Sequence, residues 1–289
     1  MLRLIFAAMM AAALISAEPA PGDAALARRV EAALAPFHLA KRPPAANDWL
    51  AQHREAGQTL AEYMAARPRP AADRRTTIYL RPLGAAEGDQ PALLDAVQAA
   101  LAAYFPVVVK RSPAHPLASI PERAKRQGGQ GAQLLSTWLL EVLAADRPAD
   151  AHAVLGLTAT DLWPGEGWNF VFGQASLVER VGVWSTARFG PAGDPLRLRR
   201  TLHTAVHETG HQFGLRHCIR WECLMNGSNH LAESDAAPPW MCHECEAKIA
   251  WSLGGDPLQR LRRLAGFAKA SGFADAEVMW TREALALAP

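Results

Sequence analysis

Cysteine, tyrosine and long apolar runs are scarce in this chain, and neither sign of charge dominates. There are 30 basic and 28 acidic side chains, a formal net charge of +2. Such a balance gives no bulk attraction to nucleic acid or to an anionic membrane, so we expect neither as a partner. The three tyrosines end at Tyr104, and the four cysteines all lie between residues 218 and 245. Whatever chemistry the thiols perform is therefore confined to one short stretch.

The one sustained apolar run lies at the start of the chain. Met1 to Arg3 give a short positive start, residues 4–16 are almost all apolar, and the small residue Ala17 precedes Glu18. This pattern is typical of a secretory signal peptide, which we assign to residues 1–17. The run is shorter than the ~20 residues that a membrane-spanning helix needs. We therefore expect an exported protein, periplasmic or extracellular, without stable membrane insertion after the signal is cleaved.

Apolar periodicity divides the remaining chain into helical ends and a mixed centre. We expect a helical segment at residues 18–73, a central domain at 74–252 and a C-terminal helical extension at 253–289. In the central domain, short β-branched and aromatic runs alternate with helical patterns, which predicts an α/β (α+β) fold with a sheet covered by helices. The predicted strands are residues 76–80, 107–109, 154–157, 170–173 and 181–184, and the predicted helices are 91–104, 121–145 and 196–213.

The last of these helices carries a dense set of metal-binding side chains. His207 and His211 are four residues apart, so both imidazoles lie on one helical face, with Glu208 beside them. Gly214 permits the turn that lets His217 return toward the same point. Three neutral imidazoles leave the fourth position of a tetrahedral zinc ion open for water, as in catalytic zinc sites. The alternative is a set of ordinary surface histidines on an amphipathic helix.

This segment, together with the residues that follow it, resembles the archaemetzincins. The resemblance is carried by the zinc motif from His207 to His217, by Cys218, by Cys223-Leu224-Met225 and by Cys242-x-x-Cys245. It extends over residues 49–249. It implies a metzincin-type zincin fold with a twisted mixed sheet, a backing helix and an active-site helix. It also implies that Met225 lies on a turn beneath the metal.

The four cysteines have two possible uses. Cys218, Cys223, Cys242 and Cys245 have the Cys-x₄-Cys and Cys-x-x-Cys spacing of a tetrahedral zinc site. The resemblance implies that they bind a second, structural zinc ion, which would give two Zn²⁺ per chain. Two disulfides are the alternative, because an exported protein meets an oxidising compartment.

Together these features predict a zinc metallopeptidase that hydrolyses a peptide or protein substrate. Zinc would acidify its bound water, and Glu208 would act as the general base. A catalytically weak, zinc-stabilised binding or scaffold protein is the alternative, as is a zinc hydrolase of another bond. Because no cysteine precedes the zinc motif, inhibition by an upstream thiolate is excluded.

Three secondary expectations concern the surroundings of the site. Some metzincins have a tyrosine two positions after the turn methionine, but here that position is Gly227, so the oxyanion donor stays unassigned. We interpret His230 as a solvated loop residue and His203 as a neighbour of the ligands. The strand at residues 170–172 could receive an extended peptide at a sheet edge.

Overall fold

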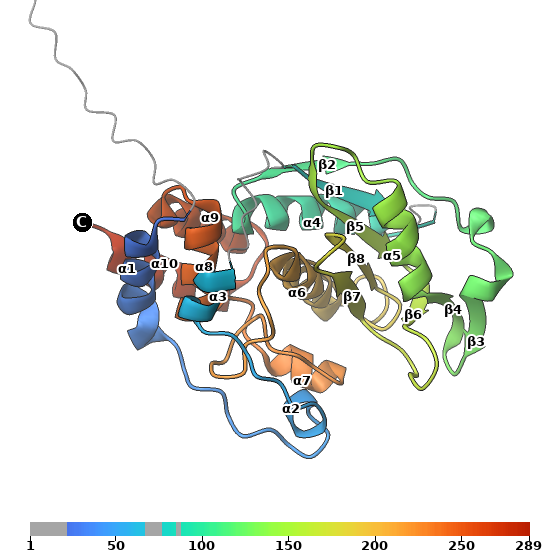
Figure 1. The fold of residues 1–289 in the computed structure, drawn as a ribbon, viewed down its shortest axis with the longest axis horizontal. Coiled ribbons are helices and arrows are strands. Elements are labelled where there is room, and N and C mark those ends of the chain that lie inside the picture. Colours follow the sequence, from blue (N-terminus) through green and yellow to red (C-terminus); the bar gives the residue numbers. More distant parts are fainter. Residues whose placement is uncertain (1–21, 67–76, 85–87) are drawn as a thin grey trace, which may run out of the picture.

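A five-stranded sheet forms the centre of the fold (Figure 1). The computed structural model describes residues 22–66, 77–84 and 88–289, so the predicted signal peptide lies outside the described residues. The strand order is β2-β1-β5-β8-β7; the first four are parallel, and β7 pairs antiparallel with β8 at one edge. The strands are β1 (Thr77–Pro82), β2 (Val108–Arg111), β5 (Ala151–Thr158), β7 (Gly173–Ser176) and β8 (Val181–Ser185). The mixed α/β class predicted from the sequence is confirmed.

A smaller sheet replaces the first half of the helix predicted at residues 121–145, so that prediction is wrong there. Its strands are β3 (Lys125–Gly128), β4 (Gly131–Leu135) and β6 (Asp161–Trp163), and within residues 121–145 only α5 (Ser136–Ala145) is α-helical. The strands β3 and β4 form an antiparallel hairpin, and Gly131 adopts φ +115° at its turn. A glycine-rich segment favours such a turn over a continuous helix.

The strand predicted at residues 170–173 is also misplaced. The regular strand β7 begins at Gly173, and Val171 makes only an isolated bridge to Leu162. Phe172 still bonds to β8, because its carbonyl accepts from Ser185 N–H (2.9 Å), whereas Val171 N–H donates to the Leu162 carbonyl on β6 (3.0 Å). The sheet edge that a peptide could approach is therefore β7.

Helices cover both faces of the five-stranded sheet. On one face lies α5, packed over Val154, Val181 and Val183. On the other face lie α4 (Gln90–Tyr104) and α6 (Pro195–Gln212), over Leu155 and Trp184. Because strand side chains alternate between faces, neighbouring residues of one strand enter different cores.

The helices from both ends of the described chain form a further layer beyond α4 and α6 (Figure 1). Their core residues join the same hydrophobic cluster as the sheet. The contacts run from α1 to α8, from α3 to α8, from α4 to α9 and from α9 to α10. The N-terminal members are α1 (Ala24–Leu34), the 3₁₀ turn Ala35–Phe37 and α3 (Leu60–Ala66), whereas the short helix α2 (Trp49–Gln52) lies apart from this layer (Figure 1). The C-terminal members are α8 (His243–Leu253), α9 (Pro257–Ala270) and α10 (Ala274–Leu287); α7 (Leu231–Ala236) and the 3₁₀ turns Leu117–Ser119 and Glu122–Ala124 lie elsewhere.

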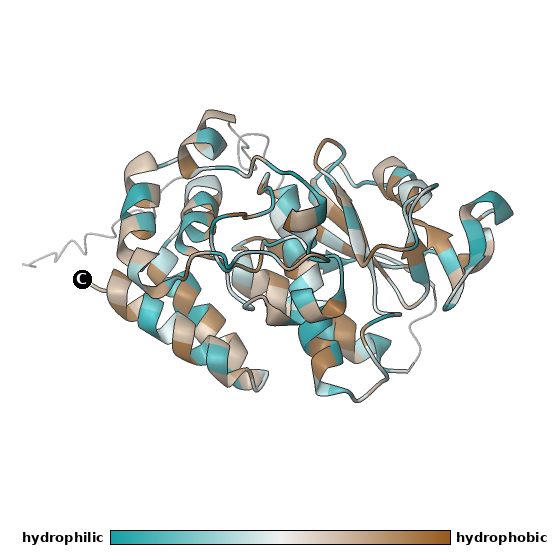
Figure 2. Ribbon diagram, turned by 90° about the horizontal axis from the view of Figure 1, so that it is seen from below, coloured by the Kyte–Doolittle hydropathy of each residue, from teal (hydrophilic) through white to brown (hydrophobic). Residues whose placement is uncertain are grey.

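Apolar and polar residues are interleaved along these helices (Figure 2). Among the described residues, no helix combines the length and the apolar character needed to cross a membrane.

A buried polar group ties the two ends of the chain together. The Glu283 carboxyl on α10 lies 2.8 Å from His38 Nε2, and both side chains are fully buried. Burial raises the pKa of Glu283 well above its usual value, and the nearby Glu246 raises it further, although Arg260 opposes them. Burial likewise lowers the pKa of His38 to about 4. Burial therefore disfavours the charged form of both groups.

Replacing Glu283 with glutamine should therefore stabilise the protein more at alkaline than at acidic pH. Between pH ~4.3, where the unfolded carboxyl titrates, and the raised folded pKa, unfolding releases a proton from Glu283. The wild type thus loses stability as pH rises through this window, whereas the glutamine variant has no such proton to lose. Urea unfolding of both proteins at pH 5.5 and pH 8 measures the difference. An identical difference in stability at the two pH values would contradict the raised pKa of Glu283.

Candidate metal centre

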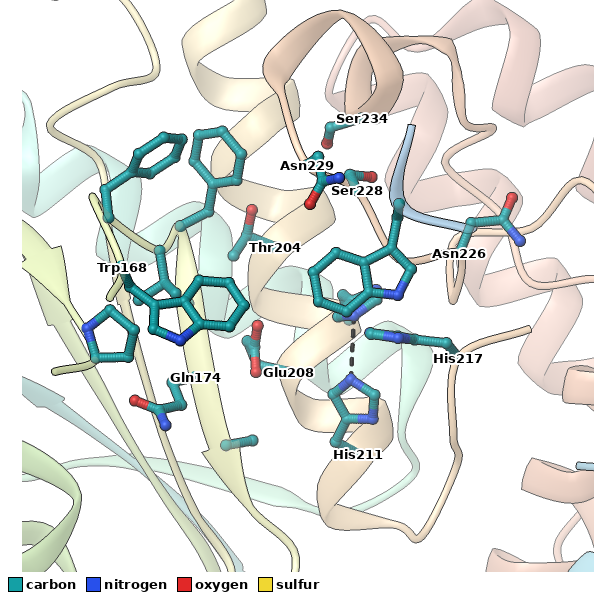
Figure 3. Close-up of a pocket in the computed structure, with 18 of the residues that line it drawn as sticks. Trp168, Gln174, Thr204, Glu208, His211, His217, Asn226, Ser228, Asn229 and Ser234 are labelled. Carbon is teal, nitrogen blue, oxygen red and sulfur yellow. Dashed lines mark hydrogen bonds between the residues drawn. The ribbon is translucent and has the colours of Figure 1, made fainter. Parts of the chain in front are cut away.

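Helix α6 brings the first two histidines to one point. Its N-terminus is capped by Asp194, whose carboxylate accepts from Leu196 N–H (2.8 Å), with Pro195 in the first turn. His207 and His211 lie one turn apart, with ring centroids 4.7 Å apart. The distance between their Nε2 atoms is 3.1 Å, the contact drawn as a dashed line in Figure 3. Both imidazoles therefore direct the same nitrogen at one small volume.

The third histidine reaches that volume through the turn after α6. Gly214 adopts φ +82°, a conformation that strains residues with a Cβ, and the chain reverses there. The ring of His217 then lies 5.3 Å from that of His207 and 5.1 Å from that of His211. One ligand nitrogen from each of the three lies within 4.8 Å of the others.

The outer nitrogens of the three rings fix the tautomers. His207 Nδ1 lies 3.0 Å from the Leu224 carbonyl, and His211 Nδ1 lies 2.7 Å from the Leu215 carbonyl. A carbonyl can only accept, so each Nδ1 carries the proton and donates it. The same applies to His217 Nδ1, which lies 2.9 Å and 3.1 Å from the two carboxylate oxygens of Glu55. In the neutral form of each ring, Nε2 is therefore left with a lone pair.

This donor set fits a tetrahedral zinc ion. Two uncharged Nε2 lone pairs 3.1 Å apart repel each other unless a cation lies against both. With Zn–N bonds of about 2.0–2.1 Å, neighbouring ligand nitrogens of a tetrahedral zinc lie about 3.3–3.4 Å apart. Burial lowers the pKa of His211 to about 4 and that of His207 well below its usual value, so both rings are in the neutral form that binds metal.

Glu208 lies beside the histidines and faces the sheet edge (Figure 3). Its side chain is buried, and burial raises its pKa to about 8. A Cβ at Gly173, the first residue of β7, would lie 2.5 Å from Glu208 Oε1. The bare α-carbon of Gly173 is what leaves room for the carboxyl group.

Replacing Gly173 with alanine should therefore displace Glu208. The added methyl group cannot coexist with the present carboxyl position, and a misplacement of about 1 Å in a reacting group can cost ~10²-fold in rate. We expect a fall of that size in kcat for peptide cleavage, with metal content unchanged. Gly266→Ala is the matched control, because a Cβ there meets nothing. Wild-type kcat in the Gly173 variant would contradict the tight fit.

A cavity of about 700 Å³ opens over the histidines and Glu208. Its wall on the β6–β7 side contains Trp168, Phe170 and Phe172. The opposite wall is polar and includes Ser228 and Asn229 from the loop after Met225 (Figure 3). The cleft therefore has an aromatic side and an amide- and hydroxyl-bearing side.

Met225 lies directly beneath α6. It is fully buried, and its Sδ would lie 2.6 Å from a Cβ at Gly210, so the thioether packs on the bare backbone between the two helical histidines. Its carbonyl accepts from Cys218 N–H (2.7 Å). The chain turns at Leu224 and Met225, and the place of Met225 beneath a metal stays a prediction.

The four cysteines form a second cluster close to the first. Their Sγ atoms lie within 4.8 Å of one another, and all four are buried free thiols. Cys218 and Cys242 have their Sγ atoms 3.7 Å apart. Zn–S bonds of about 2.3 Å place tetrahedral sulfurs about 3.8 Å apart, whereas a disulfide requires about 2.05 Å. The arrangement fits a Cys₄ zinc site and no disulfide.

The two clusters share a backbone segment. Cys223 Sγ accepts from Met225 N–H (3.4 Å) and from Cys242 N–H (3.1 Å). Leu224, between Cys223 and Met225, supplies the carbonyl that accepts from His207 Nδ1. The cysteine cluster therefore holds in place an acceptor that orients a ligand of the other cluster.

Two histidines near the set, His203 on α6 and His230 on the loop after Met225, have structural contacts. His203 is buried, and its ring lies parallel to that of His207 at 6.4 Å. His230 caps α7 by accepting from Glu233 N–H (3.1 Å), and its Nε2 lies 3.2 Å from Asp48, so it is more than a solvated residue. Neither belongs to the three-histidine set.

Sequence reasoning missed three residues of the site: Glu55, Gly173 and Trp49. The first two contact His217 and Glu208, as described above. Trp49 occupies the space beside Gly227, where a Cβ would lie 2.6 Å from the indole. Glu55 and Trp49 are more than 150 positions from the motif, so no spacing rule connects them to it. Gly173 alone offered a signal, as a glycine within a predicted strand.

Comparisons with known proteins agree with this geometry. Residues 148–251 match Peptidase family M54. The chain is 31% identical over 257 residues to archaemetzincin-2 of Macaca fascicularis, covering 75% of this chain and 71% of that protein. It is 40% identical over 113 residues to the archaemetzincin of Thermococcus kodakarensis, covering 37% of this chain and 60% of that protein. The crystal structure of archaemetzincin from Methanopyrus kandleri superposes with a TM-score of 0.52 at 31% identity, covering 66% of this chain and 96% of that one. The chain therefore belongs to the archaemetzincin family and is a metallopeptidase.

Proposed function

We propose that this chain is a zinc-dependent peptidase whose catalytic zinc is bound by His207, His211 and His217, with Glu208 as the general base. The observation that carries the proposal is the set of three Nε2 lone pairs directed at one point, with every Nδ1 proton already donated elsewhere. Such a set has no use without a cation, and three ligands leave a fourth position for the reaction.

The position of Glu208 beside the three histidines separates its role as a base from the role of the zinc ion. Zinc, when bound, supplies Lewis acidity that acidifies water and polarises the scissile carbonyl. Glu208 accepts the proton of the attacking water and returns it to the leaving amine. Burial favours a carboxyl group able to hold that proton between the two steps. Gly173 keeps the carboxyl beside the cleft.

The peptide substrate would bind along β7. This strand is the edge of the sheet, and Gly173, Gln174 and Ala175 line the cleft. An extended peptide can pair with such an edge through main-chain hydrogen bonds. N-methylation of single amides in a cleaved peptide should abolish cleavage at alternate positions near the scissile bond, because only alternate amides face a paired strand. Equal tolerance at every position would contradict strand pairing.

A second zinc ion would bind the four cysteines, in support of the structure rather than of catalysis. Four thiolates fill the tetrahedral shell, which leaves no position for water. Their free state and the 3.7 Å sulfur separation favour zinc over disulfides.

Export to the periplasm or outside the cell is a separate proposal that rests on residues 1–17. Intact mass measurement of the protein from its native cell is the test. A mature N-terminus at Glu18 is expected, and an intact Met1 would overturn it.

Elemental analysis tests the metal assignment. Native protein should contain two zinc ions per chain and His211→Ala one. A peptide library, assayed with and without a chelator, tests the activity. Zinc at the three histidines without cleavage of any peptide would favour the scaffold alternative, and no stoichiometric zinc in native protein would overturn the proposal.

A further inference from the structure

An N-terminal arm, residues 38–62, wraps around the metal centre from outside the segment that carries the histidines. It is fixed at several points by backbone hydrogen bonds. Lys41 N–H donates to the Arg220 carbonyl (2.8 Å), Trp49 N–H to the Glu233 carboxylate (2.9 and 3.0 Å) and Leu60 N–H to Glu244 (3.1 Å). The arm is therefore docked along its length.

The arm also supports the turn between the second and third histidines. Gln58 Nε2 donates to the Gly214 carbonyl (3.2 Å), and Arg216 N–H donates back to Gln58 Oε1 (3.4 Å). Tyr63, just beyond the arm, donates to the Phe213 carbonyl (2.6 Å). The backbone path that leads to His217 is thus set by a distant part of the chain.

Glu55 is the arm residue that contacts a histidine of the set. Both of its carboxylate oxygens lie within hydrogen-bonding distance of His217 Nδ1, at 2.9 and 3.1 Å. The other two histidines donate to backbone carbonyls, so His217 alone donates to a charged side chain. A carboxylate that accepts a hydrogen bond from Nδ1–H fixes the orientation of the ring. It also makes the Nε2 lone pair a stronger ligand for a metal.

Trp49 completes the contact of the arm with the third histidine. Its ring stands edge-on to that of His217, with centroids 5.3 Å apart and planes at 83°. The indole fits against Gly227, where any side chain would collide with it. On its other face, Trp49 contacts the ring of His53 at 3.9 Å, and His53 stacks toward Trp168 across the cleft at 6.0 Å.

A polar cluster between the start of α2 and α7 fastens the arm. Asp48, His230 and Glu233 lie within 4.8 Å of one another. Their polar atoms already serve the fold: Asp48 accepts from Ala45 N–H, Glu233 accepts from Trp49 and Asn229 N–H, and both nitrogens of His230 have protein partners. These hydrogen bonds connect the arm to the loop after Met225.

We propose that Glu55 is the positioning residue of the third zinc ligand, and that the docked N-terminal arm is a built-in part of the metal centre. The inference rests on the proposed zinc site at the three histidines. It assigns to the arm a share of the affinity for zinc, exerted through His217, in addition to any contribution to folding.

Zinc competition in full-length Glu55→Gln, Glu55→Ala and Glu62→Gln proteins tests the proposal. Glu62 lies on the same arm and caps α3 through Thr59 (2.7 Å), without touching a histidine, so its variant disturbs the arm alone. Loss of a carboxylate that orients a ligand typically costs 10–100-fold in metal affinity. We expect Glu55→Ala to weaken zinc binding at the three histidines by that factor and to leave zinc binding at the four cysteines unchanged. Glu55→Gln, which keeps an acceptor but loses the charge, should weaken binding at the histidines less, and Glu62→Gln should match wild type.

Cobalt substitution supplies a readout that does not depend on activity. The visible spectrum of Co²⁺ at the histidine site should shift in both Glu55 variants and stay unchanged in Glu62→Gln, because only the former alter a ligand. Wild-type zinc affinity in both Glu55 variants would overturn the inference, as would equal weakening of the cysteine site or an equal effect of Glu62→Gln. If wild-type protein itself binds no zinc at the histidines, the proposed function fails first, so the two failures are distinguishable.

Discussion

Replacing Glu208 with glutamine is expected to lower kcat/KM for a cleaved peptide by about 10²–10⁴-fold while the histidine-bound zinc is retained. Glutamine has the same shape and fits the space beside Gly173, but it cannot accept the proton of the attacking water. The three imidazoles are untouched, so metal content should stay at the wild-type value. Steady-state kinetics on a cleaved peptide, with elemental analysis of the same samples, measures both quantities.

His211→Ala supplies the contrast for this prediction. That change removes one of the three nitrogen donors, so the catalytic zinc itself should be lost together with activity. The assignment of Glu208 as base rather than ligand requires the two variants to differ in metal content. Equal zinc loss in both would contradict it.

Replacing Cys242 with alanine is expected to have the largest effect on stability. The residue caps α8, its N–H donates to Cys223 Sγ, and its own sulfur lies 3.7 Å from that of Cys218. A structural zinc contributes ~10–16 kcal/mol of apparent binding free energy, comparable with the entire ~5–15 kcal/mol of net stability of a typical domain. We expect the variant to lose the cysteine-bound zinc and to unfold at least about 10 °C below wild type.

Met241→Leu is the control for that prediction. Met241 is equally buried next to Cys242, but its replacement conserves volume and should cost less than ~1.5 kcal/mol. Alkylation of wild-type protein in denaturant with a chelator and no reductant should modify all four cysteines. Protein with no reactive thiols would instead contain disulfides, and the prediction would then fail.

In Cys242→Ala, the loss of zinc should extend from the four cysteines to the three histidines. Leu224, whose carbonyl accepts from His207, lies between Cys223 and Met225 in the loop that the cysteine cluster fixes. When that loop is released, the orientation of His207 is released with it. A measurement of zinc per chain in Cys242→Ala should therefore approach zero rather than one.

The local sequence pattern was sufficient to predict those helices and site residues whose positions are set by residues nearby in the sequence. The helix predicted at 196–213 is α6 within one residue at each end, and helices α9 and α10 lie in the extension predicted at 253–289. The set His207, His211 and His217 follows from helical spacing and one turn, and the archaemetzincin family assignment is confirmed. The roles of the three histidines as zinc ligands stay predictions.

Long-range contacts were beyond reach from the sequence. The alternation in β3 and β4 is weak, because residues 125–135 form a hairpin beside β6 whose pairing comes from another part of the chain. The edge strand began three residues later than predicted, because Val171 pairs with Leu162 instead. Glu55 carries no local sign of its contact with His217, since the side chain is an ordinary carboxylate in a polar segment.

The contact between Glu55 and His217 has a consequence for the order of folding. The two residues are 162 positions apart, so their contact closes a loop of more than half the chain. Closing such a loop costs entropy that local contacts do not repay, and contacts of high sequence separation form slowly. During synthesis the arm leaves the ribosome long before the histidines exist, and it can complete the centre only after they follow. We therefore expect proteolytic competence to be acquired late in folding, after the arm has docked against His217.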